Sequence, residues 1–155
     1  DQEEAVMLAD RIVLMFDGKL QQVGKPDEFY RHPRTAAVAK FFRSQNFLTA
    51  DRVGNIAKTK AGELSLGPDV LETGDGPVVI TVRPEALRIS MESGGHNCLP
   101  AEVQTSIYMG THTELIVELC EKIWHVQAPP STTVNEGDRI FVELPIGDIW
   151  ILDEN

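Results

Sequence analysis

The sequence contains no nucleotide-binding or nucleophile motif that would support catalysis by this chain alone. The phosphate-binding loop G-x-x-x-x-G-K-[ST] is absent, and no predicted strand is followed by G-x-G-x-x-G. The G-x-S-x-G elbow of serine hydrolases is absent as well. Gly74-Asp75-Gly76 lacks a following helix whose N-terminus would bind a phosphate. We therefore expect no catalytic residue and no bound cofactor here.

Five residues of types that bind zinc fall in the second half of the chain: His96, Cys98, His112, Cys120 and His125. Zinc ligands usually come in pairs separated by two to four residues, and only His96 and Cys98 are close, with one residue between them. Alternation along the strands does not fix which way Cys120 and His125 face. The spacing favours loop and surface histidines with a small buried thiol, so we expect no metal site.

The string Arg83-Pro84-Glu85 follows a strongly apolar stretch and is the most distinctive short motif of the second half. One interpretation is purely structural: Pro84 ends the strand, and Arg83 and Glu85 pair across the bend. The other is a regulatory or interface role, because loops at the ends of rigid strands often carry function.

A second candidate is the segment from Tyr108 to Glu114, which joins two predicted strands through Gly110. It predicts a hairpin with a bulge. Alternatively, its polar residues line the mouth of a barrel, in which case the regulatory or interface residues are Tyr108, Gly110, His112 and Glu114.

Three short helices are expected before residue 45. They cover residues 2–9, with Ala5, Leu8 and Ala9 on one apolar stripe; residues 26–32; and a stretch capped by Thr35, with Val38, Phe41 and Phe42 on one face. Acidic residues in the first turn and Pro26 near a helix start suit helix N-termini.

Two strands are expected between these helices. The run from Arg11 to Phe16 is apolar without alternation, which is typical of a strand buried on both faces in a larger sheet. Asp17-Gly18 predicts a two-residue turn into an antiparallel strand, residues 19–23. The first 45 residues offer no other strand for such a sheet.

From Asn46 onward the pattern changes to short strands in which every second residue is apolar. The predicted inward residues are Val78, Ile80 and Val82; Leu87, Ile89 and Met91; Leu115, Val117 and Leu119; Trp124, Val126 and Ala128; and Ile140, Val142 and Leu144. Glycine and proline clusters separate them. The fold class is therefore mainly β, a small barrel or sandwich preceded by a short α/β piece.

Charge divides the chain at the same place. Residues 1–45 hold seven acids and seven bases, whereas residues 46–155 hold seventeen acids and seven bases, so the net charge of −10 lies in the second part. We expect a domain boundary near residues 44–46. The acidic balance argues against a nucleic-acid partner bound through a basic face.

No apolar run approaches the roughly 20 residues needed to span a bilayer. The chain has two cysteines, too few for a disulfide framework, which favours a reducing compartment.

The first 33 residues resemble the end of the ATP-binding subunit of an ABC importer, in the branch that serves sugars, polyamines and ferric iron. The stretches from Asp1 to Met15 and from Gly18 to Pro33 carry this resemblance. Val38-Ala-Lys-Phe-Phe, Asn46-Phe-Leu, Val82-Arg-Pro-Glu85, Met109-Gly110 and Gly137-Asp138 resemble the accessory domain of the same branch, the OB-like TOBE barrel.

The resemblance implies two domains: residues 1–45, the end of the nucleotide-binding domain, and residues 46–155, a TOBE regulatory domain. Every motif that binds ATP and Mg²⁺ would lie upstream of Asp1. Partners implied are a second copy of the ATPase subunit and transmembrane permease subunits. The implied location is cytoplasmic, peripheral to the inner face of the cell membrane, without insertion into it.

A different class of function also fits a small β barrel. In molybdate-type relatives such barrels bind an oxyanion between subunits, and a barrel binding a small solute or oxyanion is the alternative expected here. The acidic surface argues mildly against an anion through long-range repulsion.

Overall fold

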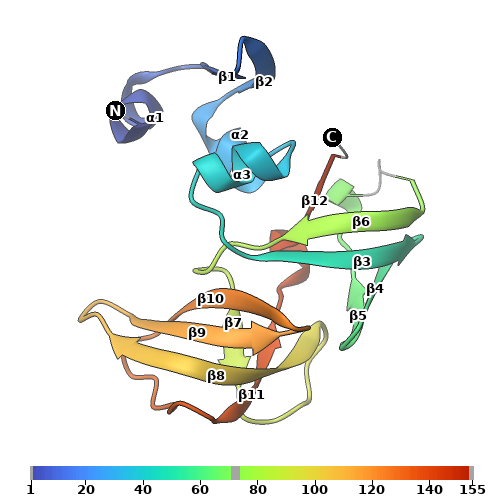
Figure 1. Ribbon diagram of the computed structural model, residues 1–155, viewed down its shortest axis with the longest axis vertical. Coiled ribbons are helices and arrows are strands. Elements are labelled where there is room, and N and C mark those ends of the chain that lie inside the picture. The colour runs from blue at the N-terminus through green and yellow to red at the C-terminus, as the bar shows by residue number, and fades with distance from the viewer. Residues whose placement is uncertain (1, 71–73, 154–155) are drawn as a thin grey trace.

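The computed structural model describes residues 2–70 and 74–153 (Figure 1). The first part, which we call the helical segment, covers residues 2–45. Its elements are α1 (Gln2–Leu8), β1 (Ile12–Phe16), β2 (Lys19–Gly24), α2 (Pro26–Arg31) and α3 (Ala36–Phe41). All three predicted helices and both predicted strands are present. They form one end of the molecule, coloured blue to cyan in Figure 1.

The hairpin β1–β2 forms as the sequence predicts. Both turn residues have positive φ, 49° at Asp17 and 72° at Gly18, and the strands pair antiparallel. However, the strand is not buried on both faces: Val13 is 60% exposed and Met15 55%. Within the described residues β1 pairs with β2 alone, so its outer face has no sheet to pack against.

The helices bury only part of what their patterns predict. Thr35 caps α3 as expected, with its hydroxyl accepting from the Val38 amide at 3.3 Å. Leu14, Phe29, Val38 and Phe42 form the small apolar cluster of the segment. The predicted stripe of α1 is wrong, because Leu8 is 83% exposed and Val6 makes the contact with the cluster instead.

The second part, which we call the barrel, comprises the described residues from 46 to 153. Its elements are β3 (Phe47–Val53), β4 (Ile56–Thr59), β5 (Gly62–Ser65), η1 (Pro68–Val70), β6 (Gly76–Thr81), β7 (Arg88–Ser90), β8 (Cys98–Tyr108), β9 (Thr113–Leu119), β10 (Lys122–Ala128), β11 (Arg139–Glu143), η2 (Ile146–Asp148) and β12 (Trp150–Leu152). They form two curled five-stranded sheets, ordered β10-β9-β8-β11-β7 and β12-β6-β3-β4-β5. The prediction of a mainly β fold is thus confirmed.

One apolar core lies between the two sheets, and it contains most of the residues predicted to face inward. The buried residues of β9, β10 and β11 repeat at every second position, with Trp124, Val117 and Val142 fully buried. Met91 is the exception, because β7 ends at Ser90 and the side chain is 61% exposed.

Five strands were not predicted: β3, β4, β5, β8 and β12. In β3 the inward position Arg52 is charged, which hides the alternation of apolar and polar residues. The Arg52 Nε donates to the carbonyl of Gly54 and its Nη1 to the carbonyl of Val70, both at 2.8 Å. In β8, Pro100 breaks the pattern of an ordinary strand. The short strands β4, β5 and β12 are too brief for a periodic signal.

None of the helices in the described ranges combines the length and apolar character required to cross a membrane.

Candidate functional site

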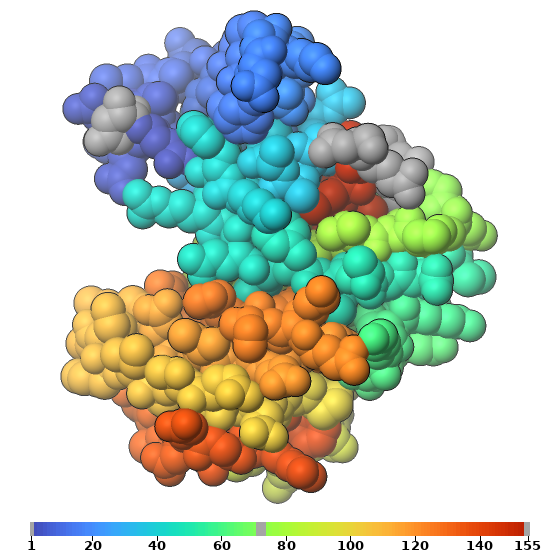
Figure 2. Space-filling view, viewed as in Figure 1, coloured from blue at the N-terminus to red at the C-terminus, as the bar shows by residue number. Residues whose placement is uncertain are grey.

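The Arg83-Pro84-Glu85 motif lies just after β6 and lines a cleft of about 350 Å³ between the helical segment and the barrel. The segment contributes Tyr30, Phe42 and Arg43 among others, and the barrel contributes Glu114, His125 and Gln127. In Figure 2 the surface is indented at this level, between the cyan segment and the orange strands. The first sequence candidate therefore meets one residue of the second, Glu114, at this cleft.

The guanidinium of Arg83 binds the C-terminal ends of two helices. Its Nε donates to the carbonyl of Tyr30, in the last turn of α2, at 3.1 Å, and its Nη1 donates to the carbonyl of Phe42, the C-cap of α3. The last carbonyls of a helix lack partners within the helix and attract cations. The same guanidinium lies over the ring of Tyr30, 4.8 Å from its centroid.

Burial lowers the pKa of Arg83, although the nearby carboxylate of Glu85 acts in the opposite direction. An arginine keeps its charge despite such a shift. The expected pairing of Arg83 with Glu85 across the bend is not what orients the guanidinium, because the hydrogen bonds of Arg83 go to the two helix carbonyls. Glu85 itself is exposed at the rim of the cleft.

Pro84 follows the end of β6 at Thr81, as the structural interpretation expects. Its carbonyl accepts from the backbone amide of Gln127 at 3.0 Å. This bond fixes the motif to β10, an edge strand of its sheet. The motif therefore connects the two sheets of the barrel as well as the barrel and the segment.

The loop from Tyr108 to Glu114 reaches the cleft only in part. Glu114 lines it, and His112 contacts the lining residue Gln127, with Nε2 to Nε2 at 3.3 Å. Tyr108, 69% exposed, and Gly110, with φ of 87°, lie at the tip of the hairpin outside the cleft lining. The predicted bulge is present in the strand pair but sits between Val103 and Thr105 of β8, not at the tip.

His125 is half-buried beside Glu114, with Nδ1 3.8 Å from Oε1 of the carboxylate. In the described part of the chain, His125 Nδ1 and Arg83 Nη2 are both buried without a hydrogen-bond partner. A buried polar group left unpaired costs about 1–3 kcal/mol. The barrel side of the cleft is thus polar and incompletely paired.

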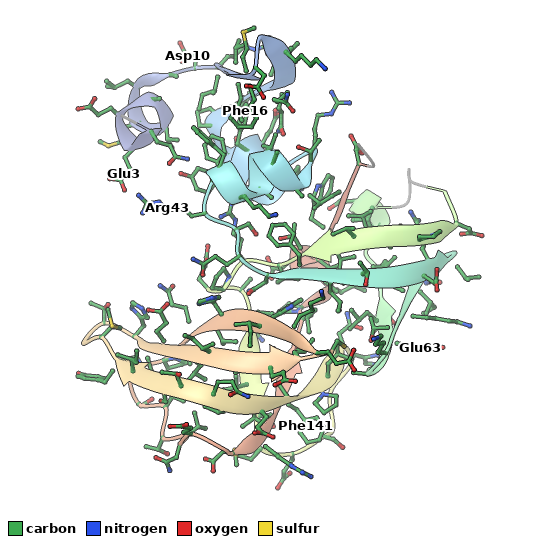
Figure 3. The ribbon with its side chains drawn as sticks, in the orientation of Figure 1. Glu3, Asp10, Phe16, Arg43, Glu63 and Phe141 are labelled. Carbon is green, nitrogen blue, oxygen red and sulfur yellow. The ribbon has the colours of Figure 1, made fainter. Side chains whose placement is uncertain are left out.

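Residues at the mouth of the cleft have opposite charges. Arg43 Nη2 lies 3.9 Å from Oε1 of Glu3, and Figure 3 shows the two side chains approaching one another beside α1. Arg43 follows the C-cap of α3 in a left-handed conformation, with φ of 63°. Both side chains are exposed, so this pair contributes little stability.

The five residues weighed as zinc ligands do not come together. Over the described ranges the structure has no group of three or more His, Cys, Asp or Glu placed to hold a metal ion. Cys98 contacts the carbonyl of His96, and Cys120 lies next to Thr59. Only His112 and His125 approach the cleft.

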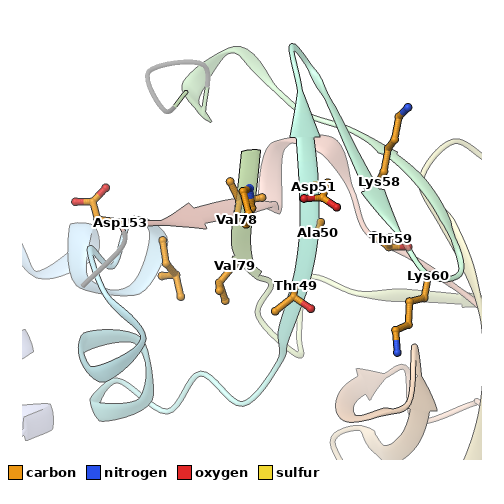
Figure 4. Close-up of a pocket in the computed structure, with 11 residues that line it drawn as sticks. Thr49, Ala50, Asp51, Lys58, Thr59, Lys60, Val78, Val79 and Asp153 are labelled. Atoms are coloured by element: carbon orange, nitrogen blue, oxygen red, sulfur yellow. The ribbon is translucent and has the colours of Figure 1, made fainter. Parts of the chain in front are cut away.

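A separate groove of about 530 Å³ lies on the outer face of the β12-β6-β3-β4 surface. Figure 4 shows Thr49 and Asp51 from β3, Val79 from β6 and Lys58 from β4 along it. The candidate residues named from the sequence are not among the described residues that line it. The groove is therefore distinct from the cleft.

Sequence reasoning did not identify Tyr30 and Phe42 as partners of the motif, nor Asn46 as the partner of Val82 and His125 beside it. Tyr30 and Phe42 act through backbone carbonyls, which leave no signal in residue type. Asn46 is fully buried and bonds the backbone of His125, an arrangement that depends on pairing 79 residues apart. A polar residue at the segment boundary was the only available sign.

Comparison with known proteins shows what this chain is similar to. Residues 80–152 match the family model of the TOBE domain. The spermidine/putrescine import ATP-binding protein PotA of Ruegeria pomeroyi is 34% identical over 94% of this chain and 42% of its own length. The Fe(3+) ions import ATP-binding protein FbpC of Fusobacterium nucleatum is 31% identical over 100% of this chain and 43% of its own length.

Among solved structures, the cytoplasmic molybdate-binding protein ModG with molybdate bound has a similar fold. The TM-score is 0.61 with 13% identity, covering 72% of this chain and 98% of that protein. Residues 80–152 thus match the TOBE domain, and the fold shared with ModG is OB-like. The chain as a whole matches the C-terminal part of ABC importer ATP-binding subunits, which confirms the resemblance found in the sequence. It spans about two fifths of the length of these relatives.

Proposed function

We propose that this chain is the C-terminal regulatory region of the ATPase subunit of an ABC importer. The observation that carries the proposal is the match of nearly the whole chain to import ATP-binding proteins, with a TOBE domain over residues 80–152. ATP and Mg²⁺ would be bound by the remainder of such a protein. This chain would contribute no catalytic residue, since it has none of the motifs that bind the phosphates.

Regulation requires that the barrel make different contacts in two states of the complete subunit. A contact biases a conformational equilibrium only by its difference in free energy between those states. The barrel offers such surface at the exposed hairpin tip near Tyr108 and along the cleft. A second copy of the ATPase subunit and the permease subunits are the partners we propose.

The proposed location follows from that role. An ATPase subunit of an importer acts at the cytoplasmic side of the membrane, held there by permease subunits. We therefore propose a peripheral, cytoplasmic position for the protein that contains this chain.

Deletion of residues 46–155 from the complete subunit tests this function. We expect basal ATP hydrolysis to persist while its regulation or the association of two subunits changes by roughly 5- to 150-fold, the usual range of allosteric coupling. Steady-state hydrolysis and sedimentation, with and without permease, measure both effects. Loss of all hydrolysis in a deletion variant that remains folded, or identical behaviour in every assay, would contradict the proposal.

A barrel that binds an oxyanion is the second candidate, favoured by the fold shared with a molybdate-binding protein. Titration with molybdate and sulfate, followed by the fluorescence of Trp124 and Trp150, distinguishes the two. Saturable binding at micromolar concentrations would support the oxyanion barrel. The net charge of −10 predicts weak binding at low ionic strength.

A further inference from the structure

The helical segment and the barrel pack as two units with separate apolar clusters. Phe29, Val38 and Phe42 belong to the cluster of the segment, whereas the barrel core runs from Leu48 to Ile151. Across the described residues the two clusters share no buried member. Units that meet without a continuous apolar interface move relative to one another unless specific contacts hold them.

Polar contacts hold this joint. Ser44 Oγ and Thr81 Oγ1 are 2.7 Å apart and buried, and Trp150 Nε1 donates to the carbonyl of Pro33 at 2.8 Å. The residues of both bonds line the same cavity as Arg83. Arg83 is the barrel residue that bonds the C-terminal ends of both α2 and α3, and so it fixes two helices rather than one point.

The joint is also incompletely filled. Besides the cleft of about 350 Å³, a second cavity of about 710 Å³ lies between the segment and the loops near Gly67 and Ile146. Tyr30, Arg83 and Glu85 line both hollows. The Arg83 side chain therefore lies between two hollows, which leave part of the joint without van der Waals contact between segment and barrel.

We propose that Arg83 is the positioning residue that sets the orientation of the barrel on the helical segment. Loss of its guanidinium removes the contacts to both helices and leaves the joint to the bonds between Ser44 and Thr81 and between Trp150 and Pro33, so the orientation of the barrel on the segment should vary more widely. The role of Arg83 in a complete subunit rests on the proposed regulatory function. There, the Arg83 contacts would couple the conformation of the barrel to that of the ATPase part.

Distances between two spin labels measure the orientation directly. In a background of Cys98→Ser and Cys120→Ser, labels are placed at the exposed positions Asp27 on α2 and Glu102 on β8. We expect one narrow distance distribution when Arg83 is present. Arg83→Gln should widen it at least twofold, while the circular dichroism spectrum remains that of a folded β protein.

Arg83→Lys provides the graded comparison. The lysine ammonium keeps the charge but lacks the planar fork that directs N–H groups at both helix carbonyls, so an intermediate width is expected. Arg34→Gln is the matched control, because Arg34 also crosses the joint but through an exposed pair with Asp153 at 3.2 Å. The control should leave the distribution narrow.

An unchanged distribution in folded Arg83→Gln overturns the inference, and so does equal widening by Arg34→Gln. If Arg83→Gln does not fold, the distance distribution of Arg83→Lys is the test: a widened distribution supports the inference and an unchanged one overturns it. The label experiment depends on this chain alone, whereas the proposed regulatory function is tested by hydrolysis in the complete subunit. The two can therefore fail independently.

Discussion

The side chain of Asn46 replaces a strand partner at the open edge of β10. Its Oδ1 accepts from the amide of His125 at 2.7 Å, and its Nδ2 donates to the carbonyl of His125 at 2.8 Å and to that of Val82 at 3.2 Å. The side-chain amide of Asn46 thus makes the pair of hydrogen bonds to His125 that the backbone of a neighbouring strand would make. It also joins the two sheets, because Val82 continues from β6.

Asn46→Ala should lower the free energy of unfolding by about 2–3 kcal/mol, since it leaves buried backbone groups of His125 and Val82 unpaired. Urea unfolding followed by Trp124 fluorescence measures this. Gln104→Ala is a suitable control: its side chain makes one long, exposed bond to Glu118, and a change within about 0.5 kcal/mol is expected. Equal effects of the two substitutions would show that Asn46 does not hold the edge.

At the scale of elements, the hairpin β1–β2 is the least protected part of the chain. Val13, Met15 and Leu20 are all more than half exposed, and each strand has an unpaired edge within the described residues. Isolated two-stranded sheets are only marginally stable in water, and exposed apolar strand edges tend to pair with strands of other chains.

The 155-residue chain should therefore self-associate at high concentration through this hairpin. Replacing Val13 and Met15 with glutamate should shift sedimentation toward the monomer, because the charges oppose edge pairing. Ile123→Glu, at an exposed position of the barrel, serves as the control and should leave association unchanged. Association that persists in the double variant would locate the contact elsewhere.

The sequence identifies elements whose burial is periodic and misses those whose burial depends on long-range pairing. The alternation of Leu115, Val117 and Leu119 was sufficient for β9. The inward Arg52 of β3 was not predictable, because its charge is compensated by carbonyls that only the folded loop supplies. In the same way, the sequence indicates Arg83 and Glu114 separately as candidates, but their meeting at one cleft depends on the register of β9 with β10 and on the bond between Gln127 and Pro84.

At the scale of the whole molecule, the barrel holds a continuous core and the helical segment does not. Trp124, Leu99 and Ile140 are among the fully buried residues of the barrel, whose core spans both sheets. The segment centres on four buried residues and exposes much of its apolar surface. Stability should therefore reside in the barrel, with the segment as the weaker unit.

A polypeptide of residues 46–155 should fold alone and unfold cooperatively, whereas residues 1–45 alone should not. Removing the segment eliminates the bond from Trp150 to Pro33 and the stacking of Trp150 on His32, whose ring centroids are 4.2 Å apart. The emission of Trp150 should move to longer wavelength as water reaches the indole. Trp124, fully buried in the barrel core, should keep its emission. Trp150→Phe in the same polypeptide leaves Trp124 as the source of tryptophan emission and so separates the two signals. A shift of the Trp124 emission, or loss of the cooperative unfolding transition, would mean that the barrel needs the segment to fold.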